Sequence, residues 1–588
     1  MKVFLAVILP AIATAKLQCH CQPSEPCWPS LTAWNQLNTS VDGNLQALRP
    51  IAAVCHNPDY DENACRALQS QRSNSSHLSN QPGALQWENW SAWPTHNEEC
   101  YLETARDIPC GQGRIPPYAV IARSAAHIQS AVRFAAQYNI KVTIRNTGHS
   151  FMGRSSAPNS LQINVHNLDE IEIQDSFVPQ VPGSIDSPSG IPAVTLGAGV
   201  QMHSAYTALN AKGITIPGGS SSTVGVVGGF LQGGGHGILG YKAGMASDNA
   251  LQFTVVTANG SIVTANAYQN QDLFWALRGG GGGTWGVVVN ATIRTYPDYP
   301  VTVAIIQYNT TSPGRRFWAG VEACHRHVVG INEQGATGYY YITPYASGSP
   351  GTSNSTYAAF QLYLYFVGQA DTQAVQRALS TMLGDMRNAT AAPLAVEVIA
   401  VPKITELLLY TFSGADSDGA LVLLGSRLLS RSFFAQPYYA AARLSHTVSQ
   451  LRLGPDEYIM GNIVAGGQVS KNRNIISSSL NPAWRDTAIH LLFTRIVSPR
   501  DSLADQEAVA RKLTLEDMPL LESLEARPMA AYCNEANAYQ PGFQSAFWGE
   551  NYQRLLQVKQ LVDPDNLFVS RLGVGSDMWD EDGICPLC

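Results

Sequence analysis

The chain has 588 residues, of which 45% are apolar and only 14% are charged. This composition is typical of a large globular protein, with length for more than one structural unit, and excludes a disordered, charge-rich chain. The 44 acidic residues outnumber the 37 basic ones, which gives a formal net charge of −7. Since the chain lacks a basic field and has no Lys/Arg run, we expect no nucleic acid and no membrane among its partners.

The first 15 residues have the pattern of a secretory signal peptide. Lys2 supplies the positive charge, residues 3–13 form a short apolar stretch, and Ala13-Thr14-Ala15 is an A-x-A cleavage site. This stretch is too short to span a bilayer. We therefore expect a secreted, extracellular protein whose mature chain begins near Lys16; the alternative is a buried N-terminal helix.

The cysteines and glycosylation sequons agree with an extracellular location. Seven of the 11 cysteines lie in the N-terminal fifth and two close the chain: Cys19, Cys21, Cys27, Cys55, Cys65, Cys100, Cys110, Cys585 and Cys588. In an oxidising compartment these are candidates for disulfides, and the isolated Cys324 and Cys533 are the candidates for unpaired thiols. Metal binding by Cys19-His20-Cys21 or by Cys585 with Cys588 is the alternative. N-x-S/T sequons begin at Asn38, Asn74, Asn89, Asn259, Asn290, Asn309, Asn354 and Asn388.

After a cysteine-rich region over residues 16–113, two α/β patterns follow in the sequence. Apolar residues at 128, 132 and 135 mark one face of a helix, and alternation over 140–144 marks a strand that runs into a loop at 146–150. The second pattern is a strand over 193–199, a helix over 204–211 and a strand over 214–216. No fixed period links the glycine-rich segments, so repeat architectures are excluded.

The next elements predict a hairpin, a second domain and a terminal helix. The strands 252–257 and 262–264 flank Asn259-Gly260, which is a signal for a type I′ turn. From about residue 301, β-rich segments at 303–308 and 339–342 alternate with a helical segment at 372–386, which indicates an α+β second domain. Near the end, apolar residues at 548, 552, 555 and 562 share one helical face, and Asp563-Pro564 ends the helix.

Several common catalytic motifs are absent or incomplete. Gly197-Ala198-Gly199 begins a dinucleotide-binding fingerprint, but Met202 stands where its third glycine belongs. The sequence has no Walker A motif, no G-x-S-x-G elbow and no H-E-x-x-H helix. A P-loop ATPase, an α/β-hydrolase and a zinc metalloprotease are therefore disfavoured.

Four segments in a fixed order carry the specific signal instead. They are Arg145-Asn-Thr-Gly-His149-Ser150 after a strand, Pro217-Gly-Gly-Ser-Ser-Ser-Thr-Val-Gly225, Gly233-Gly-Gly-His236-Gly237, and Asp272-Leu-Phe-Trp-Ala-Leu-Arg278 followed by glycines. Glycine-rich loops allow backbone N–H groups to approach a pyrophosphate without a Cβ in the way. Near the end stand Tyr532-Cys-Asn-Glu535-Ala536 and Asp563-Pro-Asp-Asn-Leu-Phe568.

Together these segments resemble the vanillyl-alcohol-oxidase type of FAD-linked oxidases, in their berberine-bridge-enzyme-like branch. Within that branch the sequence is similar to secreted fungal oxidases of the isoamyl-alcohol-oxidase type and to FAD oxidoreductases of secondary metabolism. The resemblance covers roughly residues 114–580. It implies an α+β fold, with a PCMH-type FAD-binding domain of two α/β subdomains and a substrate domain built on an antiparallel sheet.

The resemblance, combined with the changes in pattern, also predicts how the chain is divided. We expect a signal peptide over 1–15, a disulfide-tied region over 16–113, the FAD-binding domain over 114–300 and the substrate domain over 301–525. The segment 526–588 would then return to the FAD-binding domain. We expect a monomer.

The resemblance further implies FAD bonded covalently to His149 through the 8α-methyl group. The alternative is a histidine that only hydrogen-bonds its loop. Bicovalent relatives carry a cysteine at the position of Ser221, and a serine cannot form their thioether, so we expect a single attachment. The remaining residues expected to bind the cofactor are Arg145, Asn146, Thr147, Gly148, Ser150, Gly218, Gly219, Ser221, Thr223, Gly225, Gly229, Gly234, His236 and Asn534.

Tyr532 and Glu535 are the candidate catalytic residues, because oxidation of an alcohol needs a base for the hydroxyl proton. On a regular strand two residues three apart would face opposite ways, so only one would be the base, and we favour Tyr532. Glu535 could instead be a structural carboxylate. His236 could lie near the flavin or pack in a turn, and Asp248 could bind a hydroxyl or cap a turn.

These residues predict an oxidase that passes a hydride from an alcohol or secondary-metabolite substrate to FAD and then to O₂, which gives H₂O₂. The alternatives are a cyclase that uses FAD as a scaffold without net oxidation, and a secreted binding protein with an inactive site. His325 and His327 have a metal-like spacing but no third ligand nearby, so we interpret them as surface residues and expect no metal.

Overall fold

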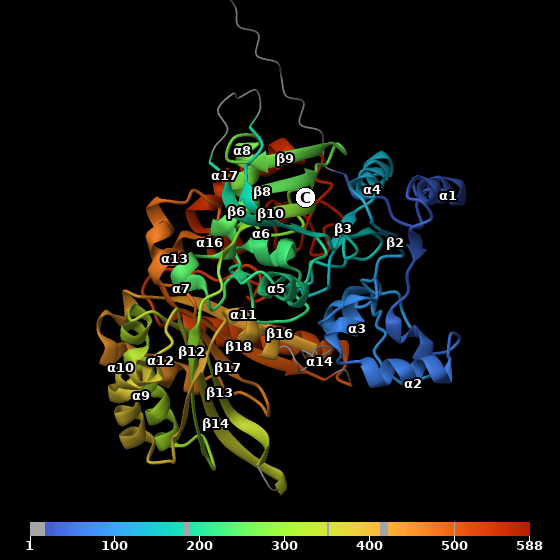
Figure 1. Cartoon of the computed structure of the whole chain (residues 1–588). Helices are drawn as coiled ribbons and strands as arrows, with labels where there is room; N and C mark the ends of the chain where they lie inside the picture. The colour runs from blue at the N-terminus through green and yellow to red at the C-terminus, as the bar shows by residue number, and fades with distance from the viewer. Residues whose placement is uncertain (1–17, 182–188, 350–351, 412–420, 499, 588) are drawn as a thin grey trace, which may run out of the picture.

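The computed structural model describes residues 18–181, 189–349, 352–411, 421–498 and 500–587 (Figure 1). The predicted signal peptide lies outside these residues. Two sheets occupy the first half of the chain and a third occupies the second half, in agreement with the predicted α+β class. Among the described residues, none of the helices combines the length and the apolar character needed to cross a membrane.

The first sheet is a mixed four-stranded sheet in the order β1-β2-β4-β3. Its strands are β1 (Leu45–Ala47), β2 (Tyr118–Ile121), β3 (Val142–Arg145) and β4 (Leu161–Asn164). β4 pairs in parallel with β2 and with β3, and β1 joins the edge antiparallel. The predicted helix is α4 (Ala125–Tyr138), and its apolar face at 128, 132 and 135 is fully buried. The cysteine-rich region thus contributes an edge strand to this sheet rather than standing apart.

The second sheet has five antiparallel strands in the order β5-β6-β10-β8-β9. They are β5 (Ile171–Phe177), β6 (Ile191–Gly197), β8 (Ala250–Val256), β9 (Ile262–Asn266) and β10 (Val287–Arg294). The hairpin β8–β9 is confirmed, but the type I′ turn is wrong, because Gly260 has a φ of +75° whereas Asn259 is not left-handed. The predicted helix after β6 is α5 (Met202–Asn210). The strand that follows it, β7 (Ile214–Thr215), pairs only with β11 (Tyr296–Pro297) in a separate ribbon.

The third sheet has seven antiparallel strands in the order β15-β12-β14-β13-β17-β18-β16. They are β12 (Val301–Thr310), β13 (Ala336–Ser349), β14 (Thr352–Val367), β15 (Ala395–Val401), β16 (Leu421–Ser430), β17 (Ile459–Ile463) and β18 (Thr487–Val497). The helices α9 (Arg315–Glu333), α10 (Thr372–Thr390) and α12 (Pro437–Ser449) pack together on one face of this sheet (Figure 1). This arrangement is the antiparallel sheet that the family resemblance implied.

The interpretation of His325 and His327 as surface residues is wrong for His325. The His325 side chain lies inside the helical layer at 1% exposure, with Nδ1 3.1 Å from Ser445 Oγ and its ring packed on Tyr340. His327 is half-buried, and its Nε2 lies 2.8 Å from Asp385 Oδ2. The helical spacing of the two residues carried no information on which of them faced the sheet.

The chain after β18 returns to the glycine-rich half of the molecule. Two helices, α16 (Phe543–Trp548) and α17 (Tyr552–Val562), are separated by a 3₁₀ turn, so the predicted helix is interrupted after Trp548, although the ring centroids of Trp548 and Tyr552 lie 5.8 Å apart. The Trp548 indole N–H donates to the Gly279 carbonyl at 3.1 Å, and α17 packs against α8 (Gln271–Leu277). The remaining helices are α1 (Leu31–Ser40), α2 (Glu62–Gln71), α3 (Ser75–Ser79), α6 (Leu231–Gly233), α7 (Gly240–Ala243), α11 (Ile404–Thr411), α13 (Gly467–Lys471), α14 (Leu503–Lys512) and α15 (Met518–Glu522).

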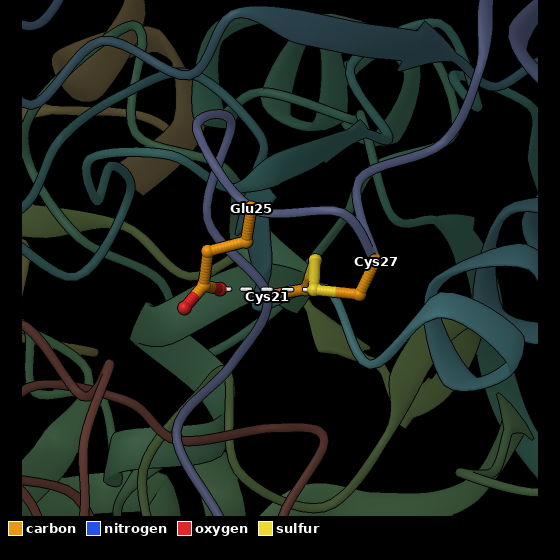
Figure 2. A group of neighbouring side chains, drawn as sticks. All are labelled: Cys21, Glu25 and Cys27. Carbon is orange, nitrogen blue, oxygen red and sulfur yellow. Dashed lines mark hydrogen bonds between the residues drawn. A yellow bond between two sulfur atoms is a disulfide. The ribbon is translucent and has the colours of Figure 1, made fainter.

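Four disulfides stabilise the irregular segments, as the cysteine positions predicted. They join Cys19 to Cys585, Cys21 to Cys27, Cys55 to Cys65, and Cys100 to Cys110. The free thiols among the described residues are Cys324 and Cys533, both buried. Figure 2 shows the disulfide of Cys21 and Cys27 beside Glu25. Because Cys19 and Cys21 are both in disulfides, the alternative of a metal site at Cys19-His20-Cys21 is wrong.

Candidate active site

A single cavity lies where the glycine-rich loops of the first half meet the C-terminal segment. One wall is the loop after β3, residues 146–152, together with Arg154. A second wall is the segment 224–232, and glycines at 282, 283 and 286 form a third. Tyr532, Asn534 and Glu535 close the cavity from the C-terminal side. Segments that are far apart in the sequence therefore converge on one site.

The loop after β3 presents His149 to this cavity. His149 Nε2 and Thr223 Oγ1 are hydrogen-bonded at 2.7 Å, so a residue of the second glycine-rich segment orients the imidazole. Gly148, with a φ of +84°, makes the turn that precedes it. Asn146, Thr147, Gly148 and Ser150 also line the cavity, as does His149 itself.

Arg145, which was expected to bind the cofactor, points away from the cavity. It is fully buried, and its guanidinium donates to the carbonyls of Leu78, Ser79 and Ala84 at 2.9–3.2 Å. Its guanidinium thus holds the cysteine-rich region beneath the loop, because one charged side chain donates hydrogen bonds to three carbonyls of that region. We correct its role to support of the loop.

The residues expected to bind the cofactor between 218 and 236 divide into those that line the cavity and those that do not. Gly225 and Gly229 line it, whereas Gly218, Gly219, Ser221, Thr223, Gly234 and His236 do not. A Cβ on Gly225 would lie 2.0 Å from Asn146 Nδ2, so this glycine is needed for close approach of two loops. A Cβ on Gly229 would meet nothing within 4 Å and would project into open space.

The residues present fit a bound dinucleotide. Glycine-rich backbone surrounds the cavity, which leaves N–H groups accessible to phosphate oxygens. Two side-chain oxygens on its wall, Asn146 Oδ1 and Gln232 Oε1, are buried and lack a hydrogen-bond partner among the residues that the structure describes. Such groups are costly unless a ligand satisfies them. Arg154 supplies a half-buried cation on the same wall.

Tyr532 and Glu535 both line this cavity. On a regular strand, as considered from the sequence, only one of them would have faced it. The Glu535 N–H donates to the Tyr532 carbonyl at 3.0 Å, so the segment is a turn and not a regular strand. The Tyr532 hydroxyl accepts hydrogen bonds from the Gly235 N–H at 3.2 Å and from Asn534 Nδ2 at 2.8 Å. Burial raises the pKa of Tyr532 well above 10, and the negative charge of Glu535 adds to this effect, so Tyr532 is a neutral phenol.

Glu535 is held between two histidines. His236 Nε2 lies 3.1 Å and His490 Nδ1 lies 3.6 Å from Glu535 Oε2. Burial by itself raises the pKa of Glu535, but the charge and hydrogen bond of His236 and the charge of His490 outweigh it and lower the pKa. Glu535 is therefore a carboxylate at neutral pH. The three ligand atoms lie within 4.8 Å of one another, so their spacing would also admit a metal ion.

The structure decides between the two interpretations of Asp248. Its carboxylate accepts two hydrogen bonds of 2.7 Å from the Arg485 guanidinium and further ones from Asn472 and the Met245 N–H. Both of its carboxylate oxygens are thus engaged within the protein, the bond from Met245 confirms the turn-capping interpretation, and Asp248 does not line the cavity. Asp248 joins the glycine-rich half to the segment before β18 as a buried ion pair.

Sequence reasoning missed three residues of the site. Arg154 donates to Asn534 Oδ1 and to the carbonyls of Arg571 and Leu572 at 2.9–3.4 Å, which binds the His149 loop to the C-terminal segment. Its position four residues after the motif was an available signal. Gln232 lies on the cavity wall next to the third glycine run. His490 carried no signal, since it stands alone in an apolar strand.

Comparison with known proteins agrees with this geometry. Residues 116–266 match the FAD-binding-domain family, and residues 531–575 match the berberine and berberine-like family. The chain is 43% identical over 573 residues to an uncharacterized FAD-linked oxidoreductase of Arthroderma benhamiae, which covers 97% of this chain and 96% of the relative. It is 38% identical to the FAD-linked oxidoreductase malF of Malbranchea aurantiaca, over 96% and 94% of the two chains. The crystal structure of the VAO-type flavoprotein MtVAO615 from Myceliophthora thermophila superposes with a TM-score of 0.84 at 31% identity, over 97% of this chain and all of that one. The chain therefore belongs to the VAO-type, berberine-bridge-enzyme-like family of FAD-linked oxidoreductases.

Proposed function

We propose that this protein is a secreted FAD-dependent oxidase that oxidises an alcohol or a secondary metabolite and reduces O₂ to H₂O₂. The observation that carries the proposal is the convergence on one cavity of His149, an ionised carboxylate at Glu535 and a neutral phenol at Tyr532. Bound there, FAD would supply the hydride acceptor. The disulfides and the signal-like leader support secretion, since disulfides persist in oxidising compartments.

The chain's own residues have separable tasks in this proposal. The loops at 146–150 and 225–229 would bind the diphosphate through backbone N–H groups, with Arg154 as the nearest cation. Glu535 would accept the hydroxyl proton of the substrate. The Tyr532 hydroxyl, which already accepts two hydrogen bonds, would donate its own proton to the substrate oxygen and orient it.

His149 would carry FAD as a single covalent attachment. Its place on the cavity wall and its hydrogen bond to Thr223 support this role, and Ser221 in place of a cysteine supports the absence of a second bond. The FAD-binding domain would comprise residues 114–300 and 526–588. Residues 301–525, which include the seven-stranded sheet, would form the substrate domain of a monomer.

A screen for peroxide release tests the proposed function. Purified enzyme would be incubated in air with alcohols, sugars and phenolic secondary metabolites, and H₂O₂ would be measured by a coupled peroxidase. The proposal expects release with at least one class, and loss of release in Glu535→Gln. Conversion of a substrate to an isomeric product without peroxide would instead show a cyclase and contradict the proposal.

A further inference from the structure

Next to the cavity, four rings pack together in a box, and two of them, His236 and His490, approach the carboxylate of Glu535. The four rings are His236, Trp484, His490 and Tyr532, and every pair of them has ring centroids 5.4–5.9 Å apart, mostly edge to face. Such packing leaves each ring little rotational freedom. The rings come from a glycine-rich loop, from the segment before β18, from β18 itself and from the C-terminal segment. This box of four rings therefore connects the surroundings of Glu535 to elements from both halves of the molecule.

His490 is the innermost member of this box. Its side chain is completely buried, and Asn462 Nδ2 donates to its Nδ1 at 3.1 Å. Burial lowers the pKa of His490 to about 4, so the ring is neutral at physiological pH. His236 is one-tenth exposed, and Glu535 is one-quarter exposed toward the cavity. Solvent protons thus reach Glu535 and His236 before they reach His490.

We propose that the base of this site is the hydrogen-bonded pair of Glu535 and His236, and that His490 is a positioning residue that holds the carboxylate in contact with His236. This inference rests on the proposed function. In the reaction, the substrate O–H bond breaks and its proton forms a bond to a Glu535 oxygen, while the His236 N–H keeps its hydrogen bond to Oε2. After the reaction, the proton leaves Glu535 through the exposed side of the cavity.

The other titratable groups around Glu535 stay neutral over the acidic pH range in which Glu535 takes up a proton. They are Tyr339 and Tyr341 of β13, Tyr458 before β17, and Tyr532 and Cys533 of its own segment. Burial raises the pKa of each of these groups. Among the described residues around Glu535, the ones that lower its pKa are therefore His236 and His490.

The test is a pH titration of the flavin absorption spectrum of the resting holoenzyme, a readout that needs no substrate. The wild type should show an acid-side inflection that disappears in Glu535→Gln. His236→Gln keeps a hydrogen-bond donor but removes the charge, and should raise the inflection by about one pH unit, a tenfold change in proton affinity. His490→Phe keeps a ring in the box but removes both nitrogens, and should produce a smaller upward shift.

The matched control is His325→Phe, the same substitution at an equally buried histidine on the helical side of the sheet. It should leave the inflection unchanged. An unshifted inflection in His490→Phe, an equal shift in His325→Phe, or a stoichiometric metal ion that His490→Phe loses would overturn the proposal. If His490→Phe does not fold, an inflection that survives Glu535→Gln overturns it equally. A purified wild type without flavin absorption would refute the proposed function itself.

Discussion

Glu535→Gln should slow flavin reduction far more than Tyr532→Phe. At pH 7 Glu535 is a carboxylate, because the charge and hydrogen bond of His236 lower its pKa, whereas burial and the charge of Glu535 raise the pKa of Tyr532 and keep it a neutral phenol. Only Glu535 is therefore present in the unprotonated form that can accept the hydroxyl proton of the substrate. Loss of a general base costs on the order of 10²–10⁴ in rate, or about 2.7–5.4 kcal/mol. Tyr532→Phe removes one hydrogen-bond donor, worth about 1 kcal/mol or roughly a factor of five.

The assay is anaerobic stopped-flow reduction of the flavin by a substrate from the peroxide screen. Glutamine has the shape of glutamate and can still accept a hydrogen bond from His236, so flavin content should stay normal. Tyr340→Phe is the control for loss of a buried hydroxyl, because Tyr340 lies on the face of β13 that packs against His325 of the helical layer. Flavin reduction in this variant should proceed at the wild-type rate. A collapse of the rate in Tyr532→Phe with a normal rate in Glu535→Gln would refute this reasoning.

Four further predictions concern the cofactor and stability. His149→Ala should release its flavin on acid precipitation, while the wild-type precipitate stays yellow. Gly229→Leu should lower flavin content without lowering the melting temperature of the flavin-free protein, since a Cβ there meets no protein atom within 4 Å. A lower melting temperature of the flavin-free variant would contradict the open space at this position. Asp248→Ala should destabilise the fold by about 3–5 kcal/mol in denaturant unfolding because it leaves the Arg485 charge buried and unpaired; a change under 1 kcal/mol would contradict this. Burial lowers the pKa of His325 to about 3, so below pH 6.5 the unfolded chain binds a proton at this residue that the native state does not bind. The free energy of unfolding should therefore fall between pH 6.5 and 3, and it should fall less steeply in His325→Phe.

The loops of the site could be predicted from the sequence because their function depends on local backbone. Because Gly225 approaches Asn146 closely, a Cβ at residue 225 is excluded, and the sequence shows this requirement directly as a glycine. The same holds for the loop that presents His149, which follows its strand without interruption. Glycine patterns next to strands therefore locate a dinucleotide site even before the sheet order is known.

The direction of buried side chains could not be predicted in this way. Arg145 lies within the motif, yet its guanidinium turns toward carbonyls of the cysteine-rich region, which no local pattern reveals. His490 occupies a strand that is almost wholly buried, where a histidine looks like part of the core. It reaches Glu535 only because β18 lies between β17 and β16 and the C-terminal segment returns to this region. Contacts of this kind depend on tertiary packing rather than on sequence spacing.

The expectation that only one of Tyr532 and Glu535 would face the flavin ring shows the same limitation. It rested on a regular strand, whereas the Glu535 N–H closes a turn on the Tyr532 carbonyl and both side chains line the cavity. Once both are placed, their environments separate their roles. Burial keeps Tyr532 protonated, whereas the charge and hydrogen bond of His236 keep Glu535 ionised.

Reoxidation of the reduced enzyme tests the central claim most directly, because it requires no knowledge of the substrate. The holoenzyme would be reduced under anaerobic conditions with a stoichiometric amount of dithionite and then mixed with air-saturated buffer. If the protein is an oxidase, the oxidised flavin spectrum should return rapidly, with one H₂O₂ formed per flavin. A flavin that stays reduced in air would contradict the claim that this protein uses O₂ as its electron acceptor.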